Sequence, residues 1–179
     1  NNSIGVIPRL IDMGVDPYLI APTLKLAIAQ RLARRICPDT GKEAPVEGAV
    51  KMMVDKEFES LPEQYRDRIS ESKTVLHPEP SPGCATGTKG RVAVMETLEI
   101  TPEIETLILS GGSEEDIYNS ARSNGFMSMK EDAINKALDH IIPYEEVNAF
   151  GTKVGKDNVL NEEYLPVDNL NGDTTEDRV

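Results

Sequence analysis

Residues 26–36 form the one long run of apolar residues and arginines in the chain, LAIAQRLARRI. Within it Ile28, Leu32 and Ile36 are four positions apart, a spacing that suits either one face of a helix or one side of a strand. Alanine and arginine are good helix formers, so local propensity favours a helix. A second run, residues 90–99, is short and β-branched and predicts a strand. Periodicity alone therefore leaves helix and strand open for the first run.

Start and stop signals predict helices on both sides of these runs. Ser3 is a candidate cap for a first helix that Gly14 ends, and the pair Asp16-Pro17 opens a second helix. Further helices are predicted over residues 46–60, from Pro62, over residues 102–110, 113–124 and 128–140, and from Pro143. Residues 75–83 are rich in proline and are predicted to be extended, with little room for a regular element.

Composition narrows the class of protein. The net charge of -12 disfavours nucleic acid as a partner, because such a surface repels phosphates. Aromatic residues make up only 4%, so the core must be aliphatic, and no apolar run reaches the roughly 20 residues of a membrane span. There is no signal-peptide pattern, which predicts a soluble, cytosolic setting. A first residue that is Asn1 rather than Met suggests a piece of a longer protein.

Several segments, in the same order along residues 1–150, carry a family resemblance. Residues 10–21, LIDMGVDPYLIA, resemble a family motif that reads L-hydrophobic-DMGVEPFLIA. The further matching segments are residues 29–38, AQRLARRICP, against AQRLVRRLCP; residues 86–91, TGTKGR, which follow Cys84, against TGYKGR after a cysteine; and residues 125–133, GFMSMKEDA, against GMRSLREDG. Together they resemble the ATPases of type II secretion and type IV pilus assembly, the GspE/PilB family.

The resemblance implies a fold. In such ATPases the AQRL segment is a strand at the edge of a RecA-like sheet, antiparallel to the segment after KGR, which implies a strand over residues 26–35 despite its helical propensity. The implied fold class is α/β: the mainly helical C-terminal part of a RecA-like P-loop ATPase core with an antiparallel edge strand pair and a helical insertion. The implied divisions are residues 1–36, the end of the RecA-like core; 37–89, an insertion with a degenerate metal-binding subdomain; 90–150, a strand plus C-terminal helices; and 151–179, a disordered acidic tail.

The resemblance also implies a function. The chain would be the C-terminal domain of a homo-hexameric ATPase that powers type IV pilus assembly or type II protein secretion, cytoplasmic and held at the inner membrane by a platform protein. ATP and Mg²⁺ would be cofactors of the parent protein. The sequence contains no GxxxxGKS or GxxxxGKT phosphate loop, Asp box or Walker B segment, so we expect no ATP hydrolysis by this chain alone. The alternative is a non-catalytic adaptor or protein-interaction module that retains the fold.

Four polar residues of the first run are candidates for contact with nucleotide or with a neighbouring subunit: Gln30, Arg31, Arg34 and Arg35. In a hexameric ATPase, basic groups near a subunit boundary stabilise charge on the phosphates. The structural alternative is that the arginines pair with acidic neighbours and protect a sheet edge. Arg34 and Arg35 fit that alternative better, whereas Arg31 fits both equally.

The two cysteines, Cys37 and Cys84, raise the question of a metal. In a chain that is not secreted, two cysteines are more often free thiols or metal-ligand remnants than a disulfide. Many members of the family resembled carry two CxxC pairs that bind zinc, and here one cysteine of each pair remains. Two thiolates do not close a structural zinc site, and neither Asp39 nor His77 lies in the family's ligand pattern. A degenerate metal-free site is therefore the first expectation, a contact or disulfide between the cysteines the second, and zinc the last.

Overall fold

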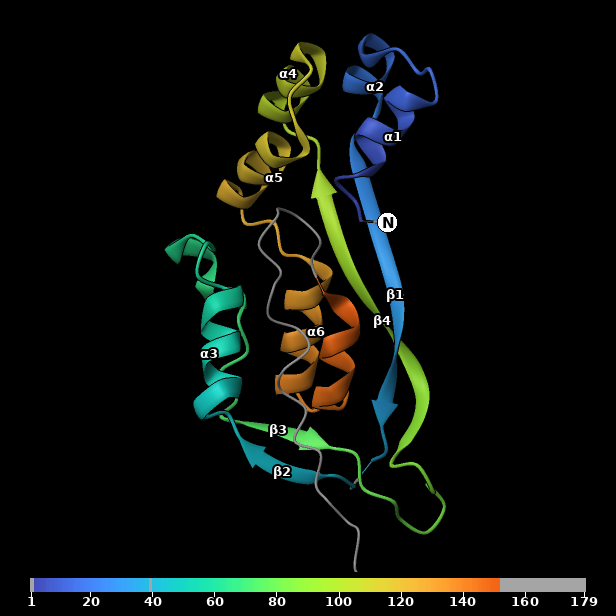
Figure 1. The fold of residues 1–179 in the computed structure, drawn as a ribbon, viewed down its shortest axis with the longest axis vertical. Helices are drawn as coiled ribbons and strands as arrows, with labels where there is room; N and C mark the ends of the chain where they lie inside the picture. Colours follow the sequence, from blue (N-terminus) through green and yellow to red (C-terminus); the bar gives the residue numbers. More distant parts are fainter. Residues whose placement is uncertain (1, 39, 152–179) are drawn as a thin grey trace, which may run out of the picture.

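The computed structural model describes residues 2–38 and 40–151. Its longest feature is a two-stranded antiparallel ribbon of β1 (Leu26–Ile36) and β4 (Thr88–Glu99). The register pairs Leu26 with Glu99 and shifts between Arg34 and Ile36. In Figure 1 the ribbon runs along most of the molecule, with α3, α5 and α6 on one side of it. The strand implied for residues 26–35 and its antiparallel partner are therefore both confirmed, against the helical propensity of the first.

The described part of the chain packs into two hydrophobic clusters, and the ribbon contributes to both. The first cluster lies at the end of the ribbon where β1 begins, and Ala27 and Leu98 are its ribbon members. Four helices build it: α1 (Val6–Asp12), α2 (Pro17–Thr23), α4 (Pro102–Ser110) and α5 (Glu114–Ser123). Since these residues are aliphatic with little aromatic content, the expected aliphatic core is confirmed here.

The second cluster surrounds α6 (Met129–Leu138), which packs against β4. Ala33 and Val94 enter it from the ribbon, and Phe58 and Leu61 enter it from the segment between the two cysteines. We call the described residues between Cys37 and Cys84 the enclosed segment. Other elements around α6 include α3 (Gly48–Glu57) and the 3-10 helices η1 (Glu63–Arg68) and η2 (Tyr144–Phe150). The enclosed segment thus packs on the helices that follow β4.

The enclosed segment also contains a small sheet that the sequence did not predict. β2 (Lys42–Pro45) pairs antiparallel with β3 (Thr74–His77), so part of the stretch expected to lack regular structure is a strand. Each strand is only four residues long, and proline lies at or beside its end. Strands this short carry almost no periodic signal, so the pairing is a tertiary outcome.

The predicted cap at Asp16 is confirmed, and two later helices begin with capping boxes. Asp16 accepts the N–H of Tyr18 at the start of α2, and Ser113 and Ser128 form capping boxes with Asp116 and Glu131. The predicted cap at Ser3 is wrong. The first helix begins after Gly5, and the hydroxyl of Ser3 is buried with no hydrogen-bond partner among the described residues.

Two further expectations concern the tail and membrane-spanning segments. The acidic tail expected from residue 151 onward lies, from residue 152, outside the described residues. Within residues 2–38 and 40–151, no helix combines the length and the apolar character that crossing a membrane requires.

Candidate functional site

The polar candidates of β1 lie on different sides of the strand. Side chains alternate along a strand, and the buried residues Ala27 and Ala33 define its inner side. Arg31 and Arg35 share the inner side with these alanines, whereas Gln30 and Arg34 belong to the opposite side. All four are exposed. The strand therefore does not bring them together as one cluster.

Two of the arginines hold η2 against β1. Nε of Arg34 lies 2.8 Å from Oε1 of Glu146, and the backbone N–H of Arg34 donates to the other carboxylate oxygen of Glu146 at 2.8 Å. Arg31 donates from Nη1 to the backbone carbonyl of Ala149 at 3.2 Å. Arg34 thus has the acidic neighbour that the structural alternative required. No described residue pairs with Arg35.

The outer side of the ribbon presents apolar side chains to solvent. We define the outer face by Leu26, Ile28, Gln30, Leu32, Ala93 and Met95. Ile28 is 57% exposed, Leu32 58% and Met95 45%. The inner side of β1 also carries apolar residues, its alanines, so this strand has apolar side chains on both sides. That pattern is typical of a strand covered on both faces in a larger α/β fold.

One edge of β1 is also open. Successive residues of a strand direct their backbone groups to opposite edges. Since the N–H of Arg34 points away from β4 and toward Glu146, the backbone groups of Ile28 and Leu32 point to the same outer edge. Within the described residues β1 has β4 as its only strand neighbour. A long edge strand with an apolar face is a template for pairing with another strand.

Glu96 is a buried carboxylate that joins three parts of the chain. It lies on β4, is 5% exposed, and accepts the backbone N–H of Ser3 through one oxygen and that of Met129 at 3.1 Å through the other. Its partner across the ladder is Ala29, so no arginine lies directly opposite it. Two N–H donors compensate for the loss of water around this charge.

A buried ion pair lies close to Glu96. Both guanidinium Nη atoms of Arg122 bond the carboxylate of Glu131, Nη1 at 3.0 Å. Arg122 also donates to the carbonyl of Phe126 at 2.6 Å and from Nε to Ser60 in the enclosed segment at 3.0 Å. Burial raises the pKa of Glu131, against the hydrogen bonds from Arg122 and Ser128 that lower it. The pair ties α5, α6 and the enclosed segment together.

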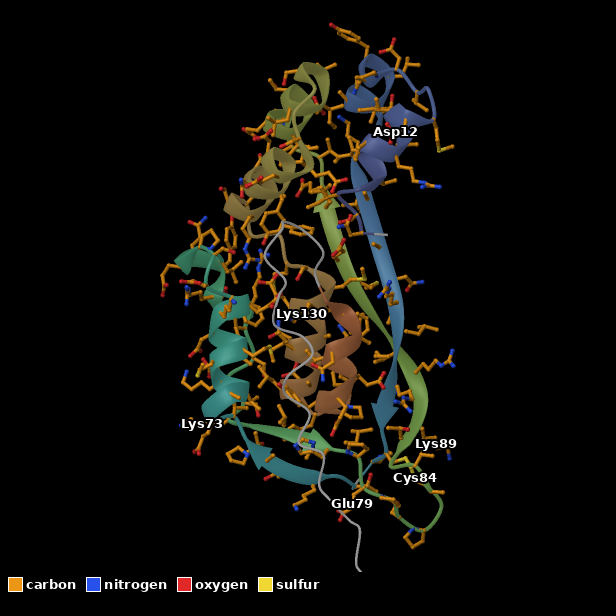
Figure 2. All side chains as sticks on the ribbon, viewed as in Figure 1. Asp12, Lys73, Glu79, Cys84, Lys89 and Lys130 are labelled. Atoms are coloured by element: carbon orange, nitrogen blue, oxygen red, sulfur yellow. A yellow bond between two sulfur atoms is a disulfide. The ribbon has the colours of Figure 1, made fainter. Side chains whose placement is uncertain are left out.

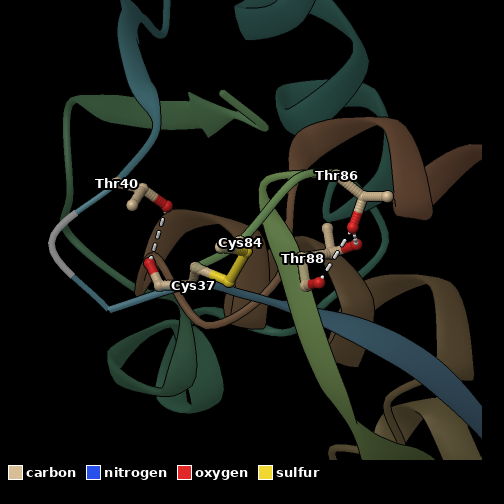
Figure 3. The surroundings of a disulfide bond; sticks show 5 residues. All are labelled: Cys37, Thr40, Cys84, Thr86 and Thr88. Atoms are coloured by element: carbon tan, nitrogen blue, oxygen red, sulfur yellow. Dashed lines mark hydrogen bonds between the residues drawn. A yellow bond between two sulfur atoms is a disulfide. The ribbon is translucent and has the colours of Figure 1, made fainter. Parts of the chain in front are cut away.

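The two cysteines are bonded to each other. Figure 3 shows the disulfide between Cys37 and Cys84, and both residues are buried. The expectation of free thiols is therefore wrong, and the arrangement ranked second from the sequence is the one that the structure contains. No group of three or more His, Cys, Asp or Glu side chains within the described residues is arranged to hold a metal ion. His77 instead bonds Glu145 through Nδ1 at 2.6 Å.

Sequence reasoning missed Glu96 and Arg122 as structural centres. A signal for Glu96 was present, because it occupies the same side of β4 as Val94 and Leu98, both of which are buried. An acidic residue on a buried strand face needs internal partners. Arg122 carried no such signal. An arginine in the last turn of a helix, as in α5, is common at exposed positions and does not indicate burial.

Comparison with known proteins adds the family. The family model described as "Type II/IV secretion system protein" matches residues 1–149. The chain is 31% identical to the type IV pilus assembly ATPase PilB of Acinetobacter baylyi, over 83% of this chain and 24% of the relative. It is 33% identical to PilB of Pseudomonas aeruginosa, over 83% and 25%, and 28% identical to type II secretion system protein E of the same species, over 82% and 27%.

These matches establish the family. The chain belongs to the type II/IV secretion system protein family, and the GspE/PilB resemblance is confirmed. It spans about a quarter of the length of the relatives named above. Mixed helices and strands with small antiparallel sheets are consistent with the α/β class.

Proposed function

We propose that residues 1–150 are the C-terminal part of a motor ATPase that drives type IV pilus assembly or type II protein secretion. In the full-length protein, by which we mean the natural polypeptide that contains residues 1–179, ATP and Mg²⁺ bind to segments outside this chain. The protein works as a homo-hexamer in the cytoplasm, at an inner-membrane platform protein. The names of the relatives support the motor role.

The observation that carries this proposal is the outer face and open edge of β1. Ile28 and Leu32 are apolar, more than half exposed, and aligned on one side of an 11-residue strand. In a self-contained domain such a strand would be a site of aggregation. In a RecA-like core it is covered by the rest of the same subunit. The role of this chain is then to complete that core, with the ribbon as the joint.

We further propose that the exposed Arg31 and Arg35 contact a neighbouring subunit or its nucleotide. Both belong to the inner side of β1, opposite the apolar outer face. Arg34 is less suited to this role, because Glu146 already neutralises its charge. Within the proposal the enclosed segment is the insertion at the end of the ribbon, held by packing and by the disulfide rather than by zinc.

ATP turnover tests the proposal. The full-length protein should hydrolyse ATP only with Mg²⁺, and residues 1–179 alone should not. Arg31→Ala in the full-length protein should lower turnover at least about tenfold, and a loss of about 10³-fold or more is expected if Arg31 contacts the transferred phosphate directly. Arg66→Ala is the matched control, because this exposed arginine pairs with Glu63 and donates to the carbonyl of Glu59, away from β1. A full-length protein without ATP turnover would favour the adaptor alternative.

A further inference from the structure

The Cys37–Cys84 disulfide closes the enclosed segment at its base. Cys37 follows the last residue of β1, and Cys84 lies in the turn that precedes β4, 47 positions later. Figure 2 shows Cys84 at the end of the molecule opposite Asp12, together with Glu79 and Lys89. The bond therefore fastens the end of the ribbon at which the enclosed segment leaves and returns.

The backbone holds the two cysteines together independently of the sulfur–sulfur bond. The N–H of Cys37 donates to the carbonyl of Gly87 at 3.0 Å, and the N–H of Gly87 donates to the carbonyl of Cys84 at 3.1 Å. Ser81 and Cys84 exchange two backbone hydrogen bonds, at 3.0 and 2.9 Å. When the bond is reduced, the thiols thus stay close, and a high effective concentration favours their re-formation of the bond.

The turn around Cys84 has a geometry that fixes this arrangement. Gly87 has a φ of +67°, and a Cβ atom at this position would lie 2.5 Å from the backbone nitrogen of Glu79. A larger residue would push the turn open. Among the described residues no cluster of three or more His, Cys, Asp or Glu side chains includes these cysteines as metal ligands. Their chemistry is then exchange with other thiols and disulfides.

The elements that respond to the bond are β2 and β3. β2 begins at Lys42 and β3 ends at His77, so both strands lie just inside the closed loop. An isolated pair of strands this short is marginally stable. Contacts with later helices support it, such as the bond between His77 and Glu145. A cross-link at the base restricts the opening of the loop further.

We propose that Cys37 and Cys84 form a reversible redox clasp, which stabilises β2 and β3 when oxidised and loosens them when reduced. The oxidant is a low-molecular-weight disulfide such as oxidised glutathione. The Cys84 thiolate attacks it, forms a mixed disulfide and releases one small thiol; the Cys37 thiolate then attacks the Cys84 sulfur and releases the second. The protein loses two electrons and two protons, and the small disulfide becomes two thiols.

Burial indicates which cysteine reacts first. Cys84 is 9% exposed and lies between exposed Gly83 and Ala85, whereas Cys37 is 3% exposed. The small disulfide therefore reaches Cys84, and Cys37 resolves the mixed disulfide. This clasp does not depend on ATP hydrolysis, so it stands or falls separately from the motor function.

The test uses the full-length protein equilibrated with reduced or oxidised glutathione, then alkylated and digested with trypsin. With oxidised glutathione, peptides 36–42 and 74–89 should be recovered as one disulfide-linked species, and with reduced glutathione both should be alkylated. Amide hydrogen exchange in β2 and β3 should be roughly tenfold faster after reduction. Cys84→Ser should show the faster exchange under both conditions. If this variant does not fold, the comparison of oxidised with reduced wild type still tests the proposal.

Three results would overturn the proposal. The first is that both cysteines remain open to alkylation in excess oxidised glutathione. The second is equal exchange of β2 and β3 in the two redox states of the wild type. The third is one zinc ion per chain in the reduced protein after dialysis, which would make the pair part of a metal site instead.

Discussion

The carboxylate of Glu96 accepts the backbone N–H of Ser3, a residue 93 positions earlier in the chain. Its second oxygen accepts the N–H of Met129 at the start of α6. One buried side chain on β4 therefore fixes both the entry of the chain into its first helix and the beginning of the helix at the centre of the second hydrophobic cluster. The inner side of the ribbon therefore positions other segments through hydrogen bonds as well as through apolar packing.

Glu96→Ala should leave two buried N–H groups without an acceptor. Since hydrogen bonds to a charged group contribute about 1.5–3 kcal/mol each, the loss of two should lower the free energy of unfolding by roughly 3–6 kcal/mol. Glu96→Gln retains one acceptor oxygen and should cost less. Urea unfolding of residues 1–179 measures both. Equal stability of the alanine variant and wild type would show that the two hydrogen bonds do not matter.

Arg122→Ala should be among the most destabilising substitutions in the chain. It would leave the Glu131 carboxylate buried without its cation, a loss that typically costs 3–5 kcal/mol. Lys51→Ala, which removes one partner of an exposed ion pair with Asp55, is the control and should cost less than about 1 kcal/mol. Chemical denaturation gives both values, and similar losses in the two variants would contradict the importance of the buried pair.

Asp116 should make the stability of α5 depend on pH. The hydroxyl and the backbone N–H of Ser113 donate to its carboxylate and hold the pKa of Asp116 below the usual value. The stabilisation is therefore present above the pKa of the unfolded chain, about 3.9, and is lost as the pH falls through the folded pKa. Asp116→Asn should melt at a lower temperature than wild type at pH 7, and the difference should vanish in acid. A difference that is constant with pH would refute this role.

The outer face should tolerate a charge in residues 1–179 but not in the full-length protein. Ile28→Lys changes an exposed side chain, so its effect on the isolated chain should stay within about 0.5 kcal/mol. In the full-length protein the same lysine would be buried against the rest of the core and should lower the melting temperature. Met52→Lys is a matched control, because Met52 is 72% exposed on α3 and away from the outer face. Equal behaviour of the two variants in the full-length protein would argue against core completion.

Sequence predicted the helices well, because their boundaries carry local chemistry. The capping boxes at Ser113 and Ser128 are local patterns, and the structure contains both. Residues 26–36 were different, since their composition favours a helix and only a partner strand makes them extended. The ladder with β4 overrides propensity by pairing the backbone along the whole run.

The features that sequence missed or left open all depend on contacts between distant residues. β2 and β3 are too short to show a period, and they exist through their pairing across the enclosed segment. The disulfide joins residues whose proximity follows from the same closure. The role of Arg34 in holding Glu146 depends on where η2 returns to the ribbon. None of these relations is present in a local window of residues.

Hydrogen exchange along β1 tests most directly whether this chain completes a larger core. The comparison is between residues 1–179 and the full-length protein, followed at the outward-pointing amides of Ile28, Gln30 and Leu32. We predict that these amides exchange rapidly in the isolated chain and are strongly protected in the full-length protein, where another strand and a covering layer close the edge and the outer face. Equally rapid exchange in both would contradict the account.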